Sequence, residues 1–166
     1  MGVDIETYSS VDLAEAGVYA YVEAPDFDIL LISYIFDDWG EDDVKTIDCF
    51  DADPDMMAEF CEALLDPQIV KTAFNANFER TCLAKWLQKP MPPEEWRCTM
   101  VMAASLTLPG RLADVAVALG TTEKKMEEGK ELIRYFSFPC KPTKANGGRT
   151  RNRQPPDGKR RVQGLW

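Results

Sequence analysis

The sequence contains no histidine, and its few cysteines are odd in number and never form a C-x-x-C pair. They are Cys49, Cys61, Cys82, Cys98 and Cys140. The absence of histidine excludes the Ser-His and Cys-His pairs that activate nucleophiles in many hydrolases. Scattered cysteines without histidine argue against a zinc site and a disulfide framework, so we expect reduced thiols. Any hydrolytic reaction would therefore have to use carboxylates and metal ions.

Long apolar runs are also missing. No stretch approaches the about 20 apolar residues that a membrane-spanning helix needs. The amino terminus is acidic and lacks the basic-then-apolar pattern of a secretory signal. We therefore expect a cytoplasmic protein with no membrane partner. The 166 residues, of which 45% are hydrophobic, suit one globular domain with a substantial core.

Positive charge is scarce except near the carboxyl end. Residues 1–140 carry 11 basic and 27 acidic residues, a net charge of −16. Residues 141–166 carry 8 basic residues and one acid, a net charge of +7, and they lose the apolar periodicity of the rest. We therefore expect a folded domain over residues 1–140 and a basic, disordered tail over residues 141–166. The alternative is a tail that follows a phosphate backbone.

Two carboxylates stand out in the first apolar segment, residues 3–7. In a strand, Asp4 and Glu6 project to one face, whereas Val3, Ile5 and Thr7 face the other. Adjacent acids on one face repel each other, and a divalent cation such as Mg²⁺ or Mn²⁺ relieves the repulsion. The alternative is an edge strand whose acids are solvated. Spacing alone leaves both readings open.

The rest of the chain predicts an α/β fold. The apolar runs predict strands at residues 27–36, 44–50 and 69–74. Helices are predicted at residues 54–65, 76–87, 95–106, 111–119 and 122–135. Three meandering strands, followed by a strand reached through a helix, predict a mixed sheet of three antiparallel strands plus one parallel strand, flanked by helices.

A second polar group follows the fourth predicted strand. Asn75 is a plausible helix cap, and Phe78 and Glu79 lie in the first helical turn after it. Ligands bind at the carboxyl ends of strands in open α/β sheets, so Glu79 can approach the first strand. The alternative is a helix start whose acid is favoured by the helix dipole.

Together the two segments resemble a known family. Asp4-Ile5-Glu6-Thr7 is similar to the first motif of the DEDD family of 3′→5′ exonucleases, which have a ribonuclease H-like fold. Asn75-x-x-Phe78-Glu79 resembles the second motif, and residues 96–100 and 112–120 resemble the helical segment that follows it. Residues 132–142 resemble the segment ahead of the polymerase domain in phage-type family A DNA polymerases. The resemblance covers about residues 1–153.

The resemblance implies a two-metal site for Mg²⁺ or Mn²⁺. In it, Asp4, Glu6 and Glu79 would be the catalytic metal ligands. Thr7 and Asn75 would contact the 3′ nucleotide, and Phe78 would lie against a base or, as we favour, in the core. The implied partners are the 3′ end of single-stranded DNA and a polymerase domain in a longer parent chain. The implied role is proofreading during DNA replication in a phage-infected cytosol.

The sequence departs from the family at two points. The acid of the second motif is usually aspartate, and here it is Glu79. The third motif is a tyrosine followed four residues later by aspartate on a late helix. Here the residue four positions after Tyr135 is Pro139, and the residue four positions before Asp157 is Arg153. We therefore expect an incomplete fragment, truncated before the third motif, that folds but cleaves weakly or not at all. The alternatives are a catalytically inactive nucleic-acid-binding or scaffold module and an exonuclease acting on RNA.

Overall fold

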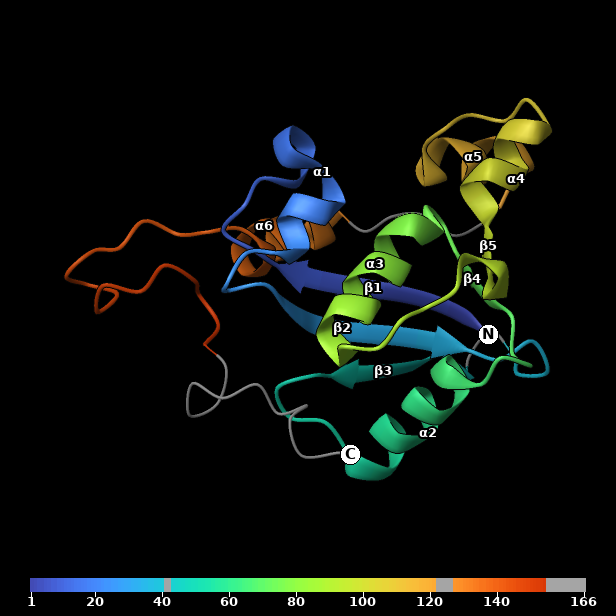
Figure 1. The fold of residues 1–166 in the computed structure, drawn as a ribbon. Helices are drawn as coiled ribbons and strands as arrows, with labels where there is room; N and C mark the ends of the chain where they lie inside the picture. The colour runs from blue at the N-terminus through green and yellow to red at the C-terminus, as the bar shows by residue number, and fades with distance from the viewer. Residues whose placement is uncertain (41–42, 122–126, 155–166) are drawn as a thin grey trace.

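A mixed five-stranded sheet forms the centre of the computed structural model, which describes residues 1–40, 43–121 and 127–154 (Figure 1). Within these residues the strand order is β3-β2-β1-β4-β5. The strands are β1 (Gly2–Tyr8), β2 (Asp28–Ile35), β3 (Lys45–Asp48), β4 (Lys71–Ala73) and β5 (Trp96–Cys98). The first three pair antiparallel, and β4 and β5 run parallel to β1. This mixed α/β arrangement is consistent with a ribonuclease H-like fold and confirms the predicted fold class.

The fifth strand is a correction to the sequence analysis. Residues 96–98 were expected within a helix over residues 95–106, but they pair with β4. A three-residue strand is too short to show an alternating pattern, and a helix follows it at once from Thr99. The helical part of that prediction is confirmed from Thr99 to Ser105.

Helices surround the sheet in the described part of the chain. They are α1 (Leu13–Val22), α2 (Pro54–Leu65), α3 (Ala76–Leu87), the short 3₁₀ helix η2 (Pro93–Glu95), α4 (Thr99–Ser105), α5 (Leu112–Leu119) and α6 (Glu127–Ser137). The side chains of Asp12 and Asp53 cap the first turns of α1 and α2 through backbone N–H groups. Helix α1 packs against α3, and α6 packs against β1. Within the described residues, the helices are too short or too polar to cross a bilayer.

Strand β1 has the two faces that its alternation predicts. Val3 and Ile5 are buried in the core, whereas Asp4 is exposed and Glu6 is half-buried. On the neighbouring strand, Asp4 lies opposite Ser33 and Glu6 opposite Leu31. The register shifts between Glu6 and Thr7, where the strand bulges. The two acids are therefore presented together on the polar side of the central strand.

Part of the basic segment after α6 contacts the strands of the sheet. Residues 140–154 are here called the C-terminal strap; its last part reaches the sheet, where Arg151 is only 6% exposed. Its guanidinium carbon lies 4.1 Å from the ring centroid of Tyr8, and Nη1 lies 3.8 Å from Asp28 Oδ2. Arg153 also pairs with Asp48. The strap docks because its positive charge meets carboxylates and aromatic faces of the acidic body. Residues 155–166 of the predicted tail lie outside the described residues.

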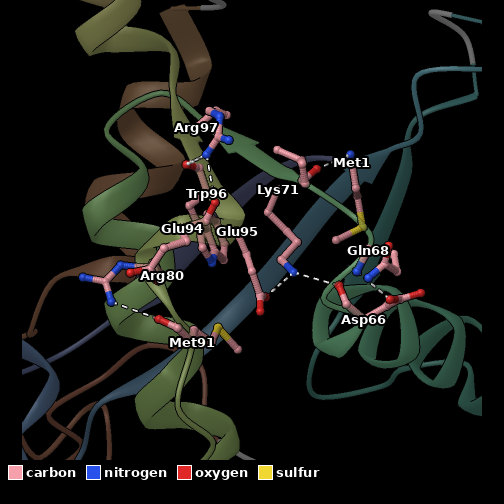
Figure 2. A network of polar contacts seen from close by, with 11 residues as sticks. Met1, Asp66, Gln68, Lys71, Arg80, Met91, Glu94, Glu95, Trp96 and Arg97 are labelled. Carbon is pink, nitrogen blue, oxygen red and sulfur yellow. Dashed lines mark hydrogen bonds and ion pairs between the residues drawn. The ribbon is translucent and has the colours of Figure 1, made fainter.

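A buried lysine joins three elements near the edge of the sheet (Figure 2). The side chain of Lys71 is fully buried, and Nζ donates to Glu95 Oε2 at 2.8 Å and to the Asp66 carbonyl oxygen at 3.1 Å. Lys71 belongs to β4, Asp66 follows α2, and Glu95 ends η2. A buried ammonium group is tolerated only when it has such partners, so this contact fixes where the chain turns around β4.

Replacing Glu95 by alanine leaves the Lys71 ammonium group buried without its carboxylate. We expect the free energy of unfolding to fall by about 2–3 kcal/mol, less than for a fully buried pair because the Glu95 side chain is 21% exposed. Urea denaturation measures the loss. Glu94→Ala, at an exposed neighbour, is the matched control. Adding Lys71→Met to Glu95→Ala should recover part of the loss, and a change below about 0.5 kcal/mol for Glu95→Ala would contradict the assignment.

Candidate functional site

The second acidic segment reaches the first through the turn between β4 and α3. Asn75 adopts a left-handed conformation with φ 72°, and its carbonyl oxygen accepts from Phe78 N at 2.8 Å. This tight turn starts α3 at Ala76 and brings Glu79 into its first turn. The parallel pairing of β4 with β1 places the turn next to the strand that carries Asp4. The prediction that Glu79 approaches the first strand is thus supported by the topology.

The carboxyl group of Glu79 is buried in a position where a negative charge is unfavourable. Its residue is 5% exposed, and Oε2 is buried without a hydrogen-bond partner in the described part of the chain. Burial and, to a smaller extent, the negative charge of Asp4 raise the pKa of this carboxyl group from its ordinary 4.5 to about 7. The influence of Asp4 on this pKa shows that the two carboxylates are electrostatically coupled.

A divalent cation would resolve this conflict. A buried carboxylate oxygen without a donor is costly unless it is protonated or binds a cation. Carboxylate oxygens are the ligands that Mg²⁺ and Mn²⁺ prefer. Asp4 and Glu79 therefore fit one side of a metal site on their chemistry and on the orphaned Oε2 atom.

Glu6 is the second acid of β1, and it is half-buried. It lies on the same face of β1 as Asp4, and its charge acts on the hydroxyl of Tyr21, whose pKa it helps to raise. Among residues 1–40, 43–121 and 127–154, no three histidine, cysteine, aspartate or glutamate side chains are grouped so that they could hold a metal ion. The three-ligand site of Asp4, Glu6 and Glu79 therefore stays a prediction.

The three predicted substrate contacts lie in different environments. Thr7 is 6% exposed, and its Oγ1 shares a hydrogen bond of 2.8 Å with the hydroxyl of Tyr21. Asn75 is exposed, and its side chain makes no capping hydrogen bond to α3. Phe78 is half-buried, and its ring centroid lies 6.1 Å from that of Tyr21. Asn75 is thus accessible at the surface, Phe78 packs against the core, and the Thr7 hydroxyl is hydrogen-bonded inside the protein; the substrate contacts themselves stay predictions.

Sequence reasoning missed the part of α1 that borders this site. The sequence predicts at most a short helical or irregular piece around residues 13–17, but α1 continues to Val22 across a kink at Gly17, which has φ 76°. The continuation carries Tyr19 and Tyr21, and burial raises the pKa of Tyr21 to about 12. An aromatic residue at every second position does not match helical periodicity, so the sequence offered no signal for this extension.

Comparison with known proteins gives one informative match. The chain is 57% identical over 152 residues to a DNA polymerase of Bacillus phage SP02, a match that covers 92% of this chain. The chain is similar to one part of a phage DNA polymerase. It spans 23% of the length of that relative. No protein-family model matches the chain, and no solved structure matches it. The predicted resemblance to a phage polymerase is confirmed at this level, and exonuclease activity is not tested by it.

The Glu79 carboxyl group predicts a pH-dependent stability. Below about pH 4.5 it is protonated in both the folded and the unfolded chain, so its burial costs little. As the pH rises through about 7 the unfolded chain ionises first, and folding then buries a charge; stability should fall by about 3 kcal/mol over this range.

Urea denaturation with a chelator present, at about pH 5 and about pH 8, measures this effect. Glu79→Gln should remove most of the decline, because a neutral amide does not ionise. Glu62→Gln, at an exposed acid of α2, is the control and should keep the wild-type dependence. Equal declines in wild type and Glu79→Gln would contradict the burial of a charged carboxylate.

Proposed function

We propose that this chain is the metal-dependent 3′→5′ exonuclease domain of a phage DNA polymerase and acts on the 3′ end of single-stranded DNA. The observation that carries the proposal is the orphaned, buried carboxylate of Glu79 coupled to Asp4 on the central strand. Two further findings support it. The sheet order is consistent with a ribonuclease H-like fold, and the chain is similar to part of a phage DNA polymerase.

The residues of the site have separate roles in this proposal. Asp4, Glu6 and Glu79 would hold Mg²⁺ or Mn²⁺, which would supply an activated water molecule and stabilise the leaving oxygen. Glu79 serves as a ligand only when it is ionised, so metal binding competes with the proton that its raised pKa favours. The exposed Asn75 side chain contacts the 3′ nucleotide at the N-terminal end of α3.

We expect hydrolysis by this chain alone to be slow. In the family that the sequence resembles, a tyrosine and an aspartate on a late helix orient the water and complete one metal site. Helix α6 packs against β1, but the residue four positions after its Tyr135 is Pro139 rather than an acid. Accurate placement of the water contributes much of the rate in such reactions, so an incomplete ligand set should cost most of the activity.

The second candidate function is a nucleic-acid-binding module without catalysis. The finding that favours it is the lack of a three-carboxylate group among the described residues. The two candidates differ in metal dependence. A binding module needs no ion at Asp4 and Glu79, whereas an exonuclease loses its reaction without one.

A 5′-labelled single-stranded oligonucleotide, incubated with the protein and Mn²⁺, tests the exonuclease. We expect slow shortening from the 3′ end, and a rate at least about tenfold lower for Asp4→Ala or Glu79→Gln, because each removes a metal ligand. Asp114→Asn, at an exposed acid of α5, is the control and should keep the wild-type rate.

Isothermal calorimetry with Mn²⁺ gives a readout independent of cleavage. Binding that Asp4→Ala abolishes supports the metal site, and its absence together with metal-independent binding of the oligonucleotide supports the binding module. An RNA strand of the same sequence, tested in parallel, decides between DNA and RNA as the substrate. Rapid cleavage at rates usual for complete enzymes would show that the tyrosine–aspartate pair is dispensable.

A further inference from the structure

An exposed aromatic ring is held in a fixed position beside the candidate site. Tyr19 is 66% exposed, yet its hydroxyl donates to Asn77 Oδ1 at 3.4 Å. The same oxygen accepts from Arg80 Nη2 at 3.1 Å, and Arg80 Nη1 donates to the Met91 carbonyl oxygen at 3.1 Å. Tyr19 therefore keeps its ring in water while its hydroxyl is anchored to α3.

The anchor ties α1 to both acidic segments. Two residues after Tyr19, the Tyr21 hydroxyl bonds to Thr7, the neighbour of Glu6 on β1. On the other side, Asn77 precedes Glu79 by two residues in the first turns of α3. Figure 1 shows α1 beside α3 near the end of β1, in agreement with the packing of these helices. Tyr19 thus stands at the rim where the two acidic segments meet.

The chemistry of this rim suits a nucleobase. An aromatic face in water gains by stacking on another ring, and bases offer such a face whatever the sequence. Arg80 adds a positive charge next to the ring, in a body whose first 140 residues carry a net charge of −16. An aromatic platform beside a cation is how proteins hold single strands without reading their sequence.

We propose that Tyr19 stacks on a base of the single strand that enters the site, and that Asn77 and Arg80 are positioning residues that fix its ring. The identity of the ligand as a single-stranded polynucleotide rests on the proposed function. The stacking contact itself needs neither a metal ion nor cleavage.

Fluorescence anisotropy of the whole chain with a 5′-fluorescein oligothymidylate, in buffer containing a chelator, measures this contact. We expect Tyr19→Ala to weaken binding about tenfold, and Tyr19→Phe and Tyr19→Trp to keep most of the affinity because they retain a ring. An abasic strand of the same length should bind wild type and Tyr19→Ala equally. Phe138→Ala, at an exposed aromatic residue outside α1 and α3, is the control and should bind as wild type.

The outcomes separate this inference from the exonuclease. Binding that depends on Tyr19, without any Mn²⁺-dependent cleavage, would contradict the proposed exonuclease activity and support the stacking contact. Cleavage with unchanged affinity in Tyr19→Ala, in a variant whose circular dichroism matches wild type, would overturn the stacking contact alone. Equal loss of abasic and thymidylate binding in Tyr19→Ala would also overturn it, because that pattern shows a structural role.

Discussion

Two acidic side chains, Asp4 on the central strand and Glu79 on the neighbouring helix α3, repel each other electrostatically, and the rest of the site depends on that repulsion. Asp4 sits on the polar face of β1, and Glu79 comes from the first turn of α3 with one carboxylate oxygen buried. The parallel step from β1 to β4, and the left-handed turn at Asn75, hold both acids in place. A fold that only needed stability would place an amide or an apolar side chain at position 79. The buried acid at position 79 therefore indicates a functional role for this site.

Extended patterns in the sequence predicted much of the fold. The alternation around Asp4 and Glu6 predicted β1 with the correct faces, and the apolar run at residues 27–36 predicted β2. Asp53 followed by Pro54 predicted the start of α2. Features fixed by tertiary contacts could not be predicted. Strand β5 is three residues long and exists because β4 offers it a partner, and α1 continues past a kink at Gly17 because it packs on α3.

The sequence indicated which acids belong to the candidate site, whose role as metal ligands stays a prediction, but it indicated only part of their surroundings. Spacing on a strand shows that Asp4 and Glu6 share a face, and a helix start after β4 indicates that Glu79 is near. Sequence spacing does not show which two acids interact electrostatically, because that depends on how α3 packs against the sheet. Thr7 has a hydroxyl suited to a ligand, but Tyr21 lies close enough to bond it. Tyr19 belongs to no sequence motif, and its position beside the site is evident only from its hydrogen bond to Asn77 on another helix.

The C-terminal strap has a consequence for how the protein is made. Tyr8 and Thr150, which lie 142 positions apart in the sequence, are joined by a hydrogen bond, and Arg151 covers the Tyr8 ring. A ribosome releases Tyr8 long before it releases the strap, so the aromatic surface at the end of β1 stays open to solvent during synthesis. Contacts between distant parts of a chain form late and slow folding. The sheet can thus assemble early, while the Tyr8 ring is covered only once the strap has also been synthesised.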